Sequence, residues 1–243
     1  MPRKLGQDAY RRIRADIISC VLPPSASVVQ SELASRYCLG LTPVREALKR
    51  LEGERFVYAV PGSGYVVSPV TLAYVHAMFE FRGIVECAAV RLAALRATQD
   101  QLARIAELSD ITYEYGNLES YIEYIGHNAQ FHKAVAEASG NPRLAETNAQ
   151  VLDEMARVFH LGLTVEDSTE RLEHDHKSLV DALTSHDPDR AEETSKGEID
   201  YALQRVRDSL NRLLSGSSRG WLSKVAVTLE SRSVHTLTSG ETQ

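Results

Sequence analysis

The chain has 243 residues, of which 43% are hydrophobic and 25% are charged, and it carries a net charge of −6. This is the composition of a folded globular protein, which excludes a collagen-like or wholly disordered chain. No apolar run approaches the roughly 20 residues of a membrane-spanning helix, and the first residues lack the apolar core of a signal peptide, so no membrane is expected. Three widely spaced cysteines exclude a disulfide scaffold and a cysteine zinc finger, and they favour a reducing, cytoplasmic location.

Charge divides the chain into a basic head, an acidic body and a tail. The head, residues 1–70, has ten Lys and Arg against six Asp and Glu, a net charge of +4. The body, residues 71–215, has fourteen against twenty-five, a net charge of −11. The tail, residues 216–243, is rich in Ser and Thr and is expected to be loosely ordered. A basic head predicts a polyanionic partner for that part alone, and chance variation of surface charge is the alternative.

The head is predicted to contain three short helices followed by a β-hairpin. From apolar periodicity and turn signals, the helices cover residues 9–22, 30–37 and 42–52, and the strands cover residues 56–60 and 65–67. Thr42 is placed as the N-cap of the third helix, with Pro43 at its first position. Residues 61–64, Pro-Gly-Ser-Gly, form the turn of the hairpin. Three helices and a hairpin make a winged helix-turn-helix.

The body shows helical periodicity almost throughout. The predicted helices cover residues 72–95, 99–115, 119–139, 143–161, 168–185 and 188–214. Short turns between helices of this length indicate antiparallel neighbours. The predicted fold is therefore dominated by helices: a winged helix-turn-helix followed by an antiparallel bundle of six to seven helices.

The third helix of the head is expected to read DNA. Its apolar stripe turns inward, so Arg45 and Lys49 project away from the packed face, one turn apart. An Arg in this place can bond two acceptors of guanine in the major groove. Arg36 and Arg50, together with Lys49, suit phosphate contacts, which position the protein without reading sequence. The alternative is a set of solvated cations on a winged helix that binds another protein.

Three segments of the head, residues 31–37, 41–51 and 60–67, resemble the DNA-binding domain of the GntR family of bacterial transcription regulators. The motif Thr-Pro-Val-Arg-Glu-Ala-Leu at 42–48 and the Pro-Gly-Ser-Gly turn are its most specific parts. The resemblance implies a homodimer that binds a palindromic operator in double-stranded DNA. With the geometry of the head, it gives the residues expected to bind DNA: Ser31, Arg36, Leu41, Thr42, Arg45, Lys49, Arg50, Ser63 and Gly64.

Two positions in the head depart from the family pattern. Ser31 and Leu41 stand where the family commonly carries arginines, and the arginine at the position of Leu41 typically contacts DNA. The loss of two donors predicts a base preference that differs from the usual family operator.

The body resembles the FadR subfamily's helical effector-binding domain, the FCD domain, over residues 79–86, 131–132, 138–144 and 176–183. Many such domains hold a divalent metal through one Asp and three His, at positions that are Asn128, His132, His176 and Glu198 here. Two ligands differ, but the formal charge of the set is unchanged, and the donors still suit zinc, nickel or manganese. The alternative is a metal-free polar pocket closed by His–Glu hydrogen bonds. Without the resemblance, each residue reads as a hydrogen-bonded core side chain.

The resemblance also implies a small organic acid as effector. Arg82, in the first signature of the body, is the candidate partner for its carboxylate, because a guanidinium binds carboxylates in a bidentate manner. An ion pair with Glu86, four residues later on the same helix, is an equal alternative.

These features predict a DNA-binding transcription regulator whose operator affinity responds to an effector. One alternative is a DNA-binding protein without an effector and with a vestigial metal site. The other is a metal-dependent hydrolase, which no nucleophile motif supports and which would not need a basic head. We therefore expect a regulator rather than an enzyme.

Overall fold

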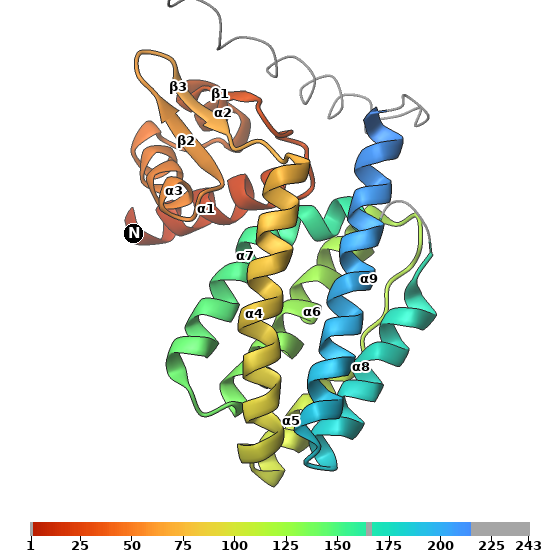
Figure 1. Cartoon of the computed structure of the whole chain (residues 1–243). Helices are drawn as coiled ribbons and strands as arrows, with labels where there is room; N and C mark the ends of the chain where they lie inside the picture. Colours follow the sequence, from red (N-terminus) through yellow and green to blue (C-terminus); the bar gives the residue numbers. More distant parts are fainter. Residues whose placement is uncertain (1, 164–166, 215–243) are drawn as a thin grey trace, which may run out of the picture. The chain divides into compact units, whose positions relative to one another are not determined.

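A computed structural model describes residues 2–163 and 167–214, which form two compact units (Figure 1). The first unit contains the chain up to Val70, and the second contains Thr71–Leu210. The tail, expected to be loosely ordered, lies outside the described residues. Within the described part of the chain, no helix combines the length and the apolar character needed to cross a bilayer.

The first unit contains three helices and a small antiparallel sheet. These elements are α1 (Pro2–Ile18), β1 (Ser27–Val28), α2 (Gln30–Tyr37), α3 (Leu41–Gly53), β2 (Val57–Val60) and β3 (Gly64–Val67). The strands lie in the order β1-β3-β2. Ile13 and Ile17 of α1 and Leu48 and Leu51 of α3 are fully buried, and Phe56 joins them from the start of the hairpin. These side chains form the core on which the winged helix-turn-helix is built.

Three details of this unit differ from the sequence prediction. Helix α1 begins at Pro2 and already ends at Ile18, before the prolines that were predicted to stop it. The strand β1 was not predicted, because two residues carry no periodic signal and Ser27 becomes a strand only by pairing with Val66 of β3. Thr42 is not the N-cap of α3: the N-cap is Gly40, and no side chain caps this helix.

The hairpin turn uses its glycines for backbone conformation. Gly62 and Gly64 have φ of 75° and 90°, in the region that side chains with a Cβ rarely adopt. A Cβ on Gly64 would also lie 3.1 Å from the carbonyl oxygen of Val28. Gly64 therefore permits both the turn and the close approach of β1 to β3.

The second unit is a bundle of helices. These are α4 (Leu72–Arg96), α5 (Gln99–Ser109), α6 (Leu118–Ala138), α7 (Pro142–Leu163), α8 (Thr169–Thr184) and α9 (Pro188–Leu214). The predicted fold class, a winged helix-turn-helix followed by a helical bundle, is confirmed. Figure 1 shows the long helices of this unit running along one another.

The core of the bundle lies where α4, α6 and α8 meet. Val90 and Ala93 of α4 pack in one cluster with Phe131 of α6 and Leu179 of α8, and all four are fully buried. Alanines on α4 leave room for close helix packing, and the larger side chains of the other helices fill the space between them. This packing fixes the helices whose polar residues are described below.

Helix α5 ends earlier than the sequence predicts. It stops at Ser109, whereas helical periodicity extends to Tyr115. The following loop buries Tyr113, whose hydroxyl accepts a hydrogen bond from the backbone N–H of Ser168 at 2.9 Å. The ring of Tyr113 also packs edge-on against Tyr121. Tertiary contacts of this loop override the local helical pattern.

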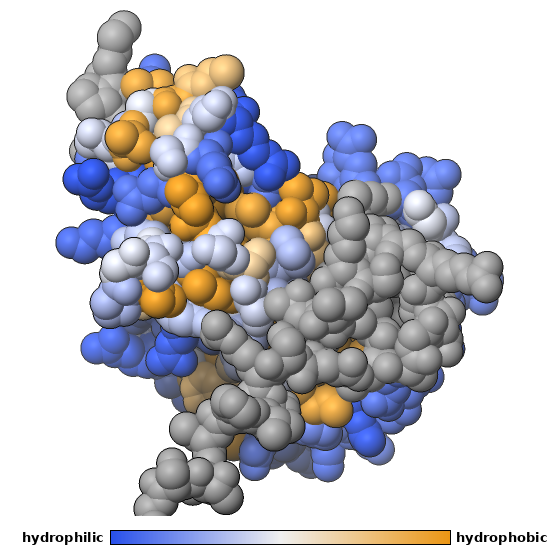
Figure 2. All heavy atoms as spheres, turned by 90° about the horizontal axis from the view of Figure 1, so that it is seen from above, coloured by the Kyte–Doolittle hydropathy of each residue, from blue (hydrophilic) through white to orange (hydrophobic). Residues whose placement is uncertain are grey.

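On the face drawn in Figure 2, hydrophobic residues reach the surface among hydrophilic ones. Several lie along one side of α4: Phe81 is 45% exposed, Ile84 is 67% exposed and Leu95 is 61% exposed. An apolar row of this kind is unusual for the free surface of a monomer and is typical of an interaction surface.

Candidate functional site

Helix α3 presents the two cations that the sequence singled out. Val44, Ala47 and Leu48 form its buried side, whereas Arg45 and Lys49 are exposed. Neither cation is held by an ion pair with another described residue. Both side chains are therefore free to meet an external anion.

The other two arginines of the predicted interface are exposed but engaged. Arg36 lies 3.2 Å from Asp16, and Arg50 donates a hydrogen bond to Glu54 at 2.9 Å. The guanidinium of Arg50 also stacks on Tyr10, 3.6 Å from the ring centre. These contacts hold both arginines in place. Arginines held in this way suit phosphate contacts better than the reading of bases.

The remaining residues predicted to contact DNA lie on α2, α3 and the hairpin. Ser31, Leu41, Thr42 and Ser63 are exposed, and Gly64 is half-buried. Because no side chain caps α3, its first backbone N–H groups are available to an acceptor such as a phosphate. The structure makes these groups accessible, and their contacts with DNA stay a prediction.

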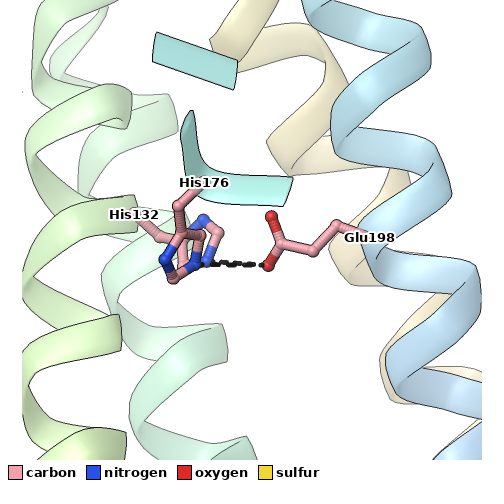
Figure 3. Close-up of side chains that lie close together, drawn as sticks. All are labelled: His132, His176 and Glu198. Carbon is pink, nitrogen blue, oxygen red and sulfur yellow. Dashed lines mark ion pairs between the residues drawn. The ribbon is translucent and has the colours of Figure 1, made fainter. Parts of the chain in front are cut away.

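Three of the four predicted metal ligands converge in the interior of the second unit. His132 extends from α6, His176 from α8 and Glu198 from α9, and their side chains point toward one another (Figure 3). Each is at least 96% buried. One ligand atom from each lies within 4.8 Å of the other two. Asn128, one helical turn before His132, is half-buried, and its Oδ1 accepts a hydrogen bond from the Tyr124 hydroxyl at 3.5 Å. Its role as the fourth ligand stays a prediction.

The His132 ring lies between two carboxylates. Its Nε2 is 3.0 Å from Oε1 of Glu198, and its Nδ1 is 3.0 Å from Oε1 of Glu86 on α4. Neither contact has hydrogen-bond geometry, so both are ion-pair contacts. The other imidazole, His176, lies tilted against Phe131 with ring centres 4.4 Å apart, and its Nε2 is 3.9 Å from the same oxygen of Glu198.

Burial and neighbouring charges shift the pKa values of the two histidines in opposite directions. Burial disfavours the charged form of His132, but Glu198 and Glu86 outweigh it and raise the pKa of His132 to about 9. Burial lowers the pKa of His176 to about 4. Burial alone would raise the pKa of Glu198, yet the neighbouring imidazole of His132 holds it near 2. At neutral pH the cluster contains one neutral imidazole and ionised carboxylates.

The donor set fits a divalent cation. Two imidazole nitrogens and a carboxylate oxygen are ligands of zinc, nickel and manganese. Both ring nitrogens of His176 and the second oxygen of Glu198 are buried without a hydrogen-bond partner among the described residues. Buried polar atoms normally have a partner, and a cation would accept a lone pair from Glu198 and from one nitrogen of His176, whose other nitrogen carries the proton. The His–Glu contacts also match the metal-free alternative, which leaves His176 unsatisfied.

Arg82 is not free in the structure. Its Nε and Nη2 bind Glu86 at 2.8 and 3.1 Å, and its Nη2 is also 3.5 Å from Glu198. Both members of the Arg82–Glu86 pair are at most 2% exposed. The ion pair considered as an alternative for Arg82 is therefore present. The sequence did not assign Glu86 to the histidine cluster, although its place on the buried side of α4 was the available signal.

The fold and the site together define a class of protein. Its members combine a winged-helix DNA-binding unit with a helical unit that contains a buried cluster of polar side chains suited to ligand binding. Two family models match the chain. Residues 5–67 match the model described as "Bacterial regulatory proteins, gntR family", and residues 77–200 match the FCD domain. The chain therefore belongs to the GntR family of bacterial transcription regulators, and its FCD domain fits the FadR-like subfamily.

Individual relatives agree with this assignment. The chain is 33% identical to the HTH-type transcriptional repressor GlaR of Escherichia coli K12, over 79% of this chain and 91% of the relative. It is 24% identical to the repressor RspR of the same organism, over 90% of this chain and 94% of the relative. Among solved structures, E. coli McbR/YncC shares the fold with a TM-score of 0.66 and 22% identity, over 84% of this chain and 97% of that one.

The function class follows from the family. The protein is a DNA-binding transcription regulator with a ligand-binding effector domain, and it is not an enzyme. Both expectations drawn from the sequence are confirmed. The hydrolase alternative is not favoured, because the family and these relatives are regulators.

Proposed function

We propose that this regulator acts in the cytoplasm as a homodimer on a palindromic operator, and that a small organic acid bound with a divalent metal in the FCD domain changes its operator affinity. The observation that carries the effector part is the buried convergence of His132, His176 and Glu198. The observation that carries the DNA part is the exposure of Arg45 and Lys49 on α3.

Base reading is assigned to the start of α3. Arg45 faces away from the core without an ion pair among the described residues, so it can bind a guanine in a bidentate manner. Leu41, 49% exposed at the first position of α3, offers an apolar contact that suits the methyl group of thymine. Ser31 has no charge for a phosphate and adds at most a neutral hydrogen bond.

Phosphate contacts are assigned to the remaining residues. Lys49 is a mobile point charge, and Arg36 and Arg50 are held in fixed positions by their ion pairs. The N-terminal turn of α3 with Thr42, and the hairpin turn with Ser63 and Gly64, supply backbone and hydroxyl donors.

The exposed apolar side of α4 supports the homodimer. Phe81 and Ile84 are large, whereas Ala77 and Ala88, also exposed, are small. In an antiparallel α4–α4 pair that crosses near Ile84, Phe81 of each copy faces Ala88 of the other. Large against small on both sides of a two-fold axis makes this face complementary to itself, which favours a second copy as its occupant.

The metal is assigned to His132, His176 and Glu198, with Asn128 as the fourth ligand. A bound divalent cation would offer a Lewis-acidic position to an effector carboxylate. Arg82 can share that carboxylate only if its contact with Glu198 is exchanged while its two bonds to Glu86 remain. A ligand that binds one arrangement of the dimer better than another shifts operator affinity by that difference.

Elemental analysis of protein purified without a His-tag tests the metal. About one equivalent per chain, lost in His132→Ala, is expected, and less than a tenth of an equivalent after loading would reject the site and leave the vestigial alternative. A DNA-shift titration with a panel of organic acids then tests the switch. Identical operator affinity with every acid that demonstrably binds would remove it.

A further inference from the structure

Glu86 lies beside the proposed metal ligands without being one of them. It is 2% exposed on α4, and its Oε1 is 3.0 Å from Nδ1 of His132. The opposite nitrogen of the same ring, Nε2, is 3.0 Å from Glu198. The two nitrogens of His132 therefore face different carboxylates, and Nε2 is the one that faces the proposed ligand Glu198.

An imidazole ligates a metal through one nitrogen and carries a proton on the other. A carboxylate that accepts this second N–H fixes the tautomer and the orientation of the ring, and it makes the ligating nitrogen more basic. We propose that Glu86 is a positioning residue for His132: its carboxylate, 3.0 Å from Nδ1, would accept the N–H of the metal-bound ring, so that Nε2 is directed at Glu198. The proposal rests on the proposed function, because it assumes a metal held by these three residues.

Arg82 fixes Glu86 in this role. The guanidinium binds both carboxylate oxygens of Glu86 from the same helix, at 2.8 and 3.1 Å, and lies 5.2 Å from the centre of the Phe159 ring. The Arg82 guanidinium thus holds the carboxylate on one side, because separating a buried ion pair leaves two charges without compensation. It remains beside His132 instead of swinging toward the metal as a further ligand.

A purely structural role explains less of the geometry. If Glu86 served only as the counter-ion of Arg82, its two bonds to the guanidinium would complete that role. The third close contact, to an imidazole on another helix, lies outside that role. Arg82, Glu86 and His132 instead form a continuous buried chain of contacts from α4 to α6.

Zinc affinity of the full-length protein, measured against a competing chelator, tests the assignment. Glu86→Gln keeps the shape and one oxygen but removes the charge, and we expect a loss of about 10- to 100-fold in zinc affinity. Glu80→Gln, also on α4 but exposed, is the matched control and should bind zinc as the wild type does. The visible spectrum of the cobalt-loaded protein should be retained in Glu86→Gln, because no ligand is replaced.

Glu86→Gln also leaves Arg82 buried without a charged partner, which can destabilise the fold. The pair Arg82→Met and Arg82→Met/Glu86→Gln removes that complication, and the second variant should again bind zinc about 10- to 100-fold more weakly than the first. If neither of these two variants folds, NMR of zinc-loaded Glu86→Gln replaces the affinity measurement. It observes the Nδ1 proton of His132. We expect it to shift upfield from its wild-type position.

The outcomes separate the two proposals. Zinc affinity that is unchanged in Glu86→Gln, with only a less stable fold, would show a structural role and overturn the inference while the metal site stands. A changed cobalt spectrum would make Glu86 a direct ligand and also overturn it. A wild-type protein that binds no zinc would overturn the metal site itself and the inference with it.

Discussion

Replacing Arg45 by Ala separates base reading from general DNA affinity. Arg45 is exposed and has no ion pair with another described residue, so the substitution removes nothing from the core, and the unfolding free energy should change by less than about 0.5 kcal/mol. If the guanidinium reads one guanine, its loss weakens operator binding by about 1–3 kcal/mol, roughly 5- to 150-fold. Nonspecific DNA should be bound almost as before, apart from the loss of one positive charge.

Lys49→Ala is the matched comparison one turn further along α3. As a phosphate contact, Lys49 should contribute equally to operator and nonspecific DNA, and its loss should lower the slope of log affinity against log salt by about 1. Fluorescence anisotropy over a salt series, with an operator obtained by genomic selection and a scrambled duplex, measures both quantities. An Arg45→Ala variant that loses operator and scrambled affinity equally would refute base reading by this residue.

Four further predictions follow from local structure. Leu41→Arg should move the selected operator from thymine toward guanine at one position in each half-site, and an unchanged selection would exclude Leu41 from the reading surface. Ile84→Glu places a charge at the centre of the apolar side of α4 and should turn a dimer into monomers in analytical ultracentrifugation, whereas a dimer of wild-type strength would exclude this face. Gly64→Ala should lower the unfolding free energy by about 1–3 kcal/mol, because its φ of 90° and the nearby carbonyl oxygen both oppose a Cβ, and chemical denaturation measures this. Burial lowers the pKa of His160 to about 4, so the unfolded state binds protons that the folded state does not as pH falls below about 6.5. Stability should therefore decline by about 2 kcal/mol between pH 7 and 5 relative to His160→Gln, and parallel pH profiles of the two proteins would contradict this origin.

The helices of the second unit could be predicted because each carries its own apolar stripe. Helix α9 begins at Pro188 and ends at Leu214, where the sequence placed it, since a proline suits the first turn of a helix. Where tertiary contacts decide, the sequence prediction was wrong. The strand β1 exists only through its pairing with β3, and the loop after Ser109 leaves the helical pattern because Tyr113 is buried there.

In the site, too, sequence patterns predict some features, and only the packing of the helices shows the others. Periodicity places His132 and His176 on inward faces of their helices, but it does not tell which inward faces meet, so their grouping with Glu198 came from family resemblance alone. Glu86 was overlooked because Arg82, four residues earlier on the same helix, already offered it a partner. Only the packing of α4 against α6 shows that the same carboxylate also reaches His132.

Helix α4 joins the features on which regulation depends in this proposal. One side buries Arg82 and Glu86 beside His132, and the opposite side exposes Phe81 and Ile84, the face proposed for a second copy. The helix also begins directly after the DNA-binding unit in the sequence. Because a buried ion pair tolerates little displacement without losing its compensation, we expect a change at His132 to shift α4 rather than to be absorbed by side-chain motion. Ligand binding at the cluster would then act on the dimer face and on the connection to the DNA-binding unit through one rigid element.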